Sequence, residues 1–85
     1  MTQIQPIPKY HLDFVAIKDG KPVKFDLTIT IPSQLQCPLP GDEVQLPLAI
    51  AKKAGFNKTD FKVEGRRFIF DSIQEGIITI FLRIL

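Results

Sequence analysis

The feature that most constrains the fold of this chain is a run of alternating apolar and polar residues over positions 10–31, interrupted once by an Asp-Gly pair. Alternation with a period of two is the pattern of a strand with one buried face. An Asp-Gly pair between two such runs is typical of a two-residue hairpin turn, because Gly20 readily takes the positive φ that this turn requires. The stretch therefore predicts a β-hairpin that turns at Asp19 and Gly20.

The same turn predicts which side chains face one another across the hairpin. Lys18 would lie opposite Lys21, and counting outward along both strands brings apolar residues together in every inward-facing pair. The predicted pairs are Ala16 with Val23, Phe14 with Phe25, Leu12 with Leu27, and Tyr10 with Ile29. On the outward face this register sets Asp13 opposite Asp26, which is an unfavourable like-charge contact.

Length and composition indicate one small globular domain. The chain has 85 residues, of which 45% are apolar and 24% charged, an ordinary balance for a folded protein. We expect residues 1–85 to form a single domain, with the proline-containing residues 1–8 as an extended lead-in. With one cysteine, no signal-peptide pattern and no apolar run near the roughly 20 residues of a membrane helix, we expect a cytoplasmic protein that does not enter the membrane.

After the hairpin, the pattern predicts a short third strand and then a short helix. A proline-rich loop follows Ile31, and residues 42–46 then alternate as a strand does. Residues 47–54 (PLAIAKKA) begin with proline, are rich in alanine and are followed by Gly55, which are helix start and stop signals in the right order. An irregular turn is the alternative for this segment.

Two further strands complete the predicted sheet. In residues 61–71 (FKVEGRRFIFD) the apolar phase changes at Gly65, which marks either a bulge in one long strand or a tight turn between two short ones. We favour the bulge, because a kinked strand can serve both halves of a curved sheet. Residues 77–85 (IITIFLRIL) are apolar on both faces, so we expect the last strand to be central in the sheet or covered by another element.

The predicted order is β-β-β-α-β-β, a mostly β fold with one short helix. Five strands in 85 residues, one with a glycine kink, favour a strongly curled sheet or a partly open barrel. A helix between the third and fourth strands is the connectivity of an OB-fold, so the chain is OB-like by analogy. A small SH3-like barrel is the alternative.

The sequence carries no arrangement of residues typical of a catalytic, metal or phosphate site. His11 is the only histidine, and in the predicted register it faces Thr28 on the polar side of the hairpin. Cys37 stands in a loop without a histidine nearby to activate it. The five glycines lie too far apart for a phosphate-binding loop. We therefore expect a protein that is not an enzyme and that uses no metal, cofactor or small-molecule substrate.

Basic residues concentrate in one segment, which gives a nucleic-acid hypothesis. Residues 52–67 hold six basic and two acidic side chains, interleaved with phenylalanines. Such a mixture can neutralise phosphates and stack on bases. The simpler interpretation places the phenylalanines in the core and the charges on a solvated rim. The candidate nucleic-acid contacts are Lys52, Lys53, Lys58, Lys62, Arg66 and Arg67.

Protein binding is the function that the sequence favours. Several apolar residues lie outside the predicted core positions, on the second face of the last strand and in the proline-rich loop. The candidate interface residues are Ile77, Phe81, Leu85, Leu35 and Leu39. The alternative is that the helix and the loop cover these residues. We expect a non-enzymatic accessory, scaffold or inhibitor protein that contacts a partner protein or a second copy of itself.

Overall fold

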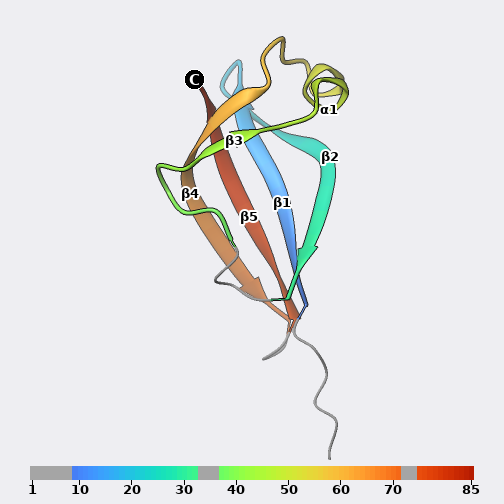
Figure 1. Cartoon of the computed structure of the whole chain (residues 1–85), viewed down its shortest axis with the longest axis vertical. Coiled ribbons are helices and arrows are strands. Elements are labelled where there is room, and N and C mark those ends of the chain that lie inside the picture. Colours follow the sequence, from blue (N-terminus) through green and yellow to red (C-terminus); the bar gives the residue numbers. More distant parts are fainter. Residues whose placement is uncertain (1–8, 33–36, 72–74) are drawn as a thin grey trace, which may run out of the picture.

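The computed structural model of the chain describes residues 9–32, 37–71 and 75–85. These residues form a mostly β structure with one short helix, in the predicted order (Figure 1). The elements are β1 (Lys9–Lys18), β2 (Lys21–Ile31), β3 (Glu43–Gln45), α1 (Leu48–Lys53), β4 (Asp60–Phe70) and β5 (Glu75–Ile84). The lead-in predicted for residues 1–8 lies outside the described residues.

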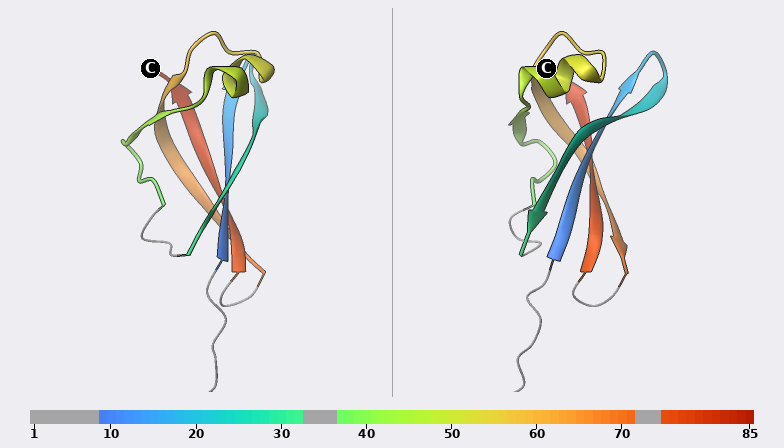
Figure 2. Two further views of the ribbon diagram at one scale, coloured as in Figure 1. Left: turned by 45° about the vertical axis from the view of Figure 1, so that its right-hand side comes forward. Right: turned by 90° about the vertical axis from the view of Figure 1, so that its right-hand side faces the viewer.

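The five strands form one mixed sheet that curls into a half-barrel (Figures 1 and 2). The strand order is β2-β1-β5-β4-β3. β1 and β5 run parallel to each other, whereas the other neighbouring strands are antiparallel. The last strand is therefore central, as its two apolar faces predicted. Its parallel pairing with β1 determines which side chains of the two strands are neighbours on each face of the sheet.

The hydrophobic core lies on the concave face of the half-barrel. Alternate residues of β1 and β5 point into it and are almost fully buried. An aromatic cluster joins the sheet to the segment after α1, since the ring centroids of Phe25, Phe56 and Phe61 lie 5.3, 5.3 and 5.7 Å apart. Tilted and edge-to-face ring pairs at this spacing are favourable.

α1 closes one end of the half-barrel (Figure 2). Pro47 precedes the first helical residue, and Gly55, with a φ of 92°, follows the last turn, as the start and stop signals predicted. Ala51 is completely buried in the core. The helix packs on β2, where the Lys53 ammonium forms an ion pair with the Asp26 carboxylate. This contact holds the helix to an outermost strand of the sheet.

The hairpin turns at the predicted residues, but its register changes halfway along. Asp19 and Gly20 both have positive φ (52° and 76°), as a type I′ turn requires. Near the turn Ala16 faces Val23, as predicted. Beyond Val15 a bulge in β2 shifts the pairing by two residues. The predicted pairs Phe14 with Phe25, Leu12 with Leu27, and Tyr10 with Ile29 are therefore wrong. The observed pairs are Leu12 with Ile29 and Tyr10 with Ile31.

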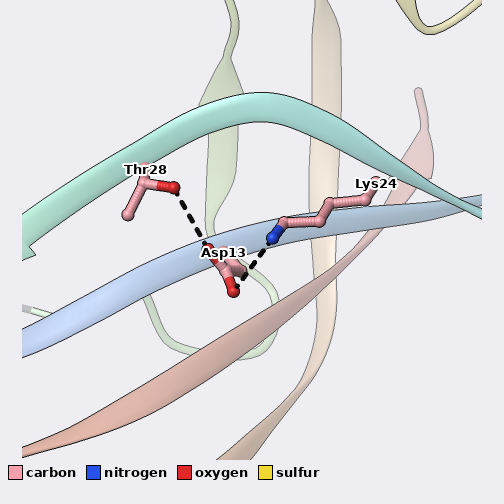
Figure 3. A network of polar contacts seen from close by, with 3 residues as sticks. All are labelled: Asp13, Lys24 and Thr28. Atoms are coloured by element: carbon pink, nitrogen blue, oxygen red, sulfur yellow. Dashed lines mark hydrogen bonds and ion pairs between the residues drawn. The ribbon is translucent and has the colours of Figure 1, made fainter.

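The bulge keeps the inward face apolar and removes an electrostatic penalty. A shift of two residues leaves each side chain on its own face, because strand side chains alternate. Asp13 faces Thr28 instead of Asp26, and the Thr28 hydroxyl donates a hydrogen bond to Asp13 Oδ1 over 3.3 Å. Lys24 Nζ lies 3.5 Å from Asp13 Oδ2 (Figure 3). The predicted like-charge pair does not form, and Asp13 gains a hydroxyl and an ammonium instead.

β4 is one long strand with a bulge, as we favoured from the sequence. Its register against β5 shifts between Val63 and Gly65, so that Glu64 is the extra residue. Before the shift Phe61 points into the core, and after it Phe68 lies on the same concave face and packs against the core. β3 pairs only with the first part of β4, so the second part of β4 forms a margin of the sheet.

Candidate protein-binding face

The convex face of the sheet carries the side chains that do not enter the core. The strand registers arrange these side chains in rows that cross β2, β1, β5 and β4 in that order. The rows are Lys24, Val15, Phe81 and Gly65; then Thr28, Asp13, Thr79 and Arg67; then Thr30, His11, Ile77 and Ile69. We call this surface the convex face.

Phe81 lies at the centre of the apolar part of the convex face. It is partly exposed and lies between Val15 of β1 and Gly65 of β4. A Cβ added to Gly65 would meet no atom within 4 Å, so the space beside Phe81 on this side is open. An aromatic ring next to an uncovered glycine is accessible to the side chain of a partner.

A second apolar pair lies further along the same strands. Ile77 of β5 faces Ile69 of β4, and Ile69 is 41% exposed. Between the two apolar rows runs a polar row, in which Thr79 lies between Asp13 and Arg67. The convex face therefore offers two apolar contacts separated by hydrogen-bonding and charged groups.

Val15 and Ile69 belong to this surface, although the sequence did not mark them as interface residues. Val15 reaches Phe81 only through the parallel ladder between β1 and β5, which no local pattern specifies. A local signal was nevertheless present, because Val15 and Ile17 are apolar at positions where the alternation of β1 calls for polar residues. Ile17 is 59% exposed.

The charged side chains around the apolar centre carry both signs, with Asp13, Glu43, Glu64 and Glu75 among the basic residues. Five cations lie on the convex face: Lys9, Lys24, Lys62, Arg67 and Arg83. Two of them are neutralised, because Arg83 Nε lies 3.6 Å from Glu64 Oε1 and Lys24 pairs with Asp13. Lys62 and Arg67 form no ion pair among the described residues, although Glu43 lies opposite Lys62 on β3. The rim of this face therefore carries a net positive charge.

The described elements leave the convex face uncovered. α1 lies on the concave side of the sheet (Figure 2). The segment between β2 and β3 buries Cys37 in the same concave core, and the segments on either side of α1 bury Leu46 and Phe56 there. The alternative considered from the sequence, that helix and loop cover the second face of the last strand, does not hold for the described residues.

The other predicted interface residues do not join Ile77 and Phe81. Leu85 follows β5 and is 49% exposed at the end of the sheet. Leu39 is exposed in the turn that precedes β3. Leu35 lies outside the described residues. The predicted set therefore reduces to the two residues of β5, with neighbours from β1 and β4 added by the strand registers.

The basic residues of segment 52–67 do not form a single surface. Lys52 and Lys53 lie at the end of α1, where Lys53 is paired with Asp26. A side-chain hydrogen bond and the charge attraction between these two groups hold the pKa of Asp26 below its ordinary value and that of Lys53 above it. Lys58 lies in the connection to β4, at the mouth of a pocket.

On β4 the remaining basic residues lie on both faces of the sheet, because neighbouring side chains of a strand alternate, and the bulge sets Lys62 on the face of Arg67. Arg67 lies on the convex face, whereas Arg66 lies on the concave side, where its guanidinium carbon is 5.2 Å from the centroid of the Phe68 ring. Phe56 and Phe61, which the sequence interleaves with the basic residues, are buried in the core. The interpretation as core phenylalanines is therefore correct for these two.

A pocket of about 390 Å³ opens at the end of the half-barrel near the hairpin turn. Lys18 Nζ lies in it and donates a 2.6 Å hydrogen bond to the carbonyl oxygen of Gly55, while lying 5.8 Å from the centroid of the Phe56 ring. This lysine is thus engaged in holding the hairpin tip to the end of α1. The pocket thus lies at the junction between the hairpin tip and the segment after α1. Its lining residues are Ile17, Lys18, Asp19, Gly55, Phe56, Asn57, Lys58 and Ile84.

The two side chains with catalytic potential occupy ordinary structural positions. His11 lies on the convex face, with its Nδ1 3.0 Å from the Thr30 hydroxyl oxygen, and its predicted partner Thr28 faces Asp13 instead. Cys37 is a buried free thiol. Within residues 9–32, 37–71 and 75–85, no three His, Cys, Asp or Glu side chains gather where they could hold a metal ion.

In the described part of the chain, no helix has the length and the apolar character that crossing a membrane requires. The chain matches no protein-family model, no curated protein and no solved structure.

Proposed function

We propose that this chain is a non-enzymatic protein-binding module and that the convex face is its binding surface. The observation that carries the proposal is the partly exposed Phe81 between Val15 and Gly65. Aromatic side chains contribute much of the binding energy of an interface when the partner removes them from water. An accessory or scaffold role in a larger assembly, in the cytoplasm where the Cys37 thiol stays reduced, fits a small domain of this kind.

The partner is a protein that presents an apolar contact surrounded by carboxylates. Two cations of the rim, Lys62 and Arg67, form no ion pair among the described residues, and Arg67 has no acidic residue opposite it on β5. Acidic groups placed around an apolar contact would speed association and fix its orientation. The same cations would face one another if two copies docked through this surface, so we expect a different protein chain at this face.

Affinity capture from a nuclease-treated cell lysate tests the proposal. The informative variant is Phe81→Glu, and Leu48→Glu is its matched control, because Leu48 is 50% exposed on α1, away from the convex face. We expect wild type and Leu48→Glu to capture the same protein, and Phe81→Glu to capture it at least about tenfold less well. Circular dichroism and thermal unfolding establish that both variants are folded.

A second variant separates binding from folding. Arg67→Glu reverses a charge on the rim and leaves the apolar centre intact, so it should slow association with the captured partner and reduce its dependence on salt. Equal capture by all baits, or capture that nuclease treatment abolishes, would show that the convex face does not bind a protein.

Nucleic-acid binding through segment 52–67 is the alternative function. Its support is the Arg66 guanidinium over the Phe68 ring, an arrangement to which an unpaired base can add by stacking. It ranks second because the other basic residues of the segment lie on different faces. Fluorescence anisotropy with labelled single-stranded and duplex oligonucleotides tests it. Salt-dependent binding that Arg66→Ala weakens would favour this function, and no binding at low salt would exclude it.

A further inference from the structure

We propose that residues 66–70 of β4, which we call the β4 edge, are a second interaction site at which two copies of this chain pair edge to edge. In this arrangement the two β4 strands run antiparallel about a two-fold axis at Phe68, and one continuous sheet spans both copies. The site is distinct from the Phe81 contact of the convex face and takes a different partner, a second copy of the chain itself.

The other margins of the sheet have features that prevent such pairing. β2 is an outermost strand, but it begins with Lys21, Pro22 and, two residues later, Lys24, and a bulge interrupts it. α1 also packs on it, with Lys53 paired to Asp26. β3, the other outermost strand, is three residues long. Lysine, proline, bulges and short strands are the means by which natural sheets avoid pairing at their edges.

The β4 edge follows the bulge at Glu64 and contains two arginines, but residues 66–70 themselves include no lysine, proline or bulge. β3 and the residues just before it pair with β4 only as far as Val63, and no described residue hydrogen-bonds to the outer side of residues 66–70. Phe70 is 55% exposed, and Ile69 beside it is also exposed. This end of β4 lies at the opposite end of the molecule from α1 (Figures 1 and 2). A strand margin that is both unpaired and apolar is a template for an added strand.

The hydrogen-bonding direction of each residue at the β4 edge follows from its neighbour. The Asp71 N–H donates a 3.0 Å hydrogen bond to the Glu75 carbonyl oxygen, so Asp71 faces β5. In an antiparallel pair, residues that bond to the neighbouring strand alternate with residues that face away from it. Counting back along the ladder with β5, Phe70, Phe68 and Arg66 therefore direct their N–H and C=O groups outward.

The side chains of the same three residues form a column on the concave side of the edge. The Arg66 guanidinium carbon lies 5.2 Å from the centroid of the Phe68 ring, and the rings of Phe68 and Phe70 are stacked with centroids 6.0 Å apart. Arg66 has no acidic partner among the described residues. The column thus offers one cation and two aromatic rings beside backbone groups to which no described residue hydrogen-bonds.

This column is complementary to a second copy of itself in one antiparallel register. With the axis at Phe68, Arg66 of each copy lies opposite Phe70 of the other, where a cation–π contact can form. On the convex side, Arg67 of each copy lies opposite Ile69 of the other. All three outward-facing residues then pair, and each pair exchanges two backbone hydrogen bonds.

The neighbouring registers are less favourable. With the axis at position 67, Arg67 would lie directly opposite Arg67 of the second copy, a like-charge pair. With the axis at position 69, Arg66 would extend past the end of the other β4 and only two of the three outward-facing residues would pair. Because a single register avoids both costs, the pattern specifies one dimer rather than a mixture.

Sedimentation equilibrium of the full chain over a range of concentrations tests the proposal. The β4 edge is short, so we expect a weak, reversible monomer–dimer equilibrium with a Kd in the micromolar to millimolar range. Opposite charges at position 70 give a matched pair of variants, because both remove the same exposed ring and leave the core intact.

Phe70→Glu would place a carboxylate opposite Arg66 of the second copy. We expect it to tighten the dimer about three- to tenfold at low salt, and we expect high salt to remove this gain. Phe70→Arg would place a cation opposite the same Arg66 and should weaken the dimer by at least a similar factor. Equal effects of the two variants would overturn the register.

Two further variants locate the contact. Phe70→Pro removes an N–H that faces away from β5, so the unfolding temperature of the monomer should hold while the dimer weakens about tenfold or more. Phe81→Glu should leave self-association unchanged, since it alters the convex face. A wild-type chain that is monomeric up to about 1 mM, or a dimer that Phe81→Glu dissociates, would overturn the proposal.

Discussion

Lys18, the last residue of β1, donates a 2.6 Å hydrogen bond from its ammonium to the carbonyl oxygen of Gly55, which follows α1. The contact joins the tip of the hairpin to the end of the helix. Gly55 has a φ of 92°, a conformation in which a side chain is strained, and a Cβ at this position would also meet the Lys18 ammonium. Two independent costs therefore fall on any substitution of Gly55.

Gly55→Ala should lower the free energy of unfolding by about 1–2 kcal/mol, because alanine is strained at this φ. Urea unfolding followed by circular dichroism measures the change. Lys18→Ala is the control, since it removes the obstructing ammonium and leaves the backbone conformation as it is. The double variant should recover only a small part of the loss. A neutral Gly55→Ala would contradict the left-handed conformation at this position.

Gly76 and Gly65 allow a matched comparison of two glycines within strands. A Cβ on Gly76 would lie 2.7 Å from the backbone carbonyl oxygen of Ile69, which cannot move without opening the ladder between β4 and β5. A Cβ on Gly65 would meet no atom within 4 Å. We expect Gly76→Ala to cost about 2 kcal/mol of stability and Gly65→Ala less than about 0.5 kcal/mol. Equal costs in denaturant unfolding would contradict the close approach at Gly76.

The register of the hairpin can be tested by placing a carboxylate on β2. Thr28 faces Asp13, so Thr28→Asp should destabilise the fold by about 0.5–1 kcal/mol at neutral pH and low salt, and by less at high salt. Thr30 faces His11 instead, so Thr30→Asp should change the stability of the fold little. Without the bulge in β2, Thr28 would face His11, and Thr28→Asp would then be harmless. Thermal unfolding of the two variants at two salt concentrations distinguishes these registers.

The ion pair between Asp26 and Lys53 should give stability a dependence on pH at both ends of the scale. The pKa of Asp26 is lowered by the hydrogen bond and charge of Lys53, so its contribution is complete above about pH 5 and is lost as pH falls below about 4. The pKa of Lys53 is raised by the same contact, so its contribution is complete below about pH 9 and is lost as pH rises above about 10.

Because both groups are exposed, this effect is small and is screened by salt. The measurement is the unfolding temperature from acid to alkaline pH, with Asp26→Asn and Lys53→Met beside wild type. Each variant should flatten the curve at both ends. A profile unchanged by either substitution would mean that the pair does not stabilise the folded chain.

The features that the sequence predicted correctly are set by a few neighbouring residues. The turn at Asp19 and Gly20, the helix between Pro47 and Gly55, and the bulge before Gly65 each follow from local backbone preferences or a local change of apolar phase. The two apolar faces of the last strand left two alternatives, a central place in the sheet or cover by another element, and the strand order shows the first.

The features that the sequence did not predict depend on pairing over long distances. Alternation is unchanged by a shift of two residues, so the inward-facing pairs of the hairpin are apolar in either register. The only sequence feature that favoured the shifted register was the unfavourable contact predicted between Asp13 and Asp26. The parallel pairing that brings Val15 beside Phe81 has no local signature. One extra residue in β4 places Lys62 on the same face as Arg67, whereas an uninterrupted strand would place it with Arg66.

The parallel ladder between β1 and β5 also affects how the protein reaches its folded state. The ladder joins the first strand to the last, with Lys9 beside Glu75 and Ala16 beside Leu82. The entropy of closing so large a loop opposes folding before the central pairing can stabilise it, so we expect folding on a scale of roughly milliseconds to seconds, slow for a domain of this size. During synthesis, the hairpin of β1 and β2 exposes its apolar face until β5 has left the ribosome. The unfinished chain is therefore more prone to aggregation than the finished one.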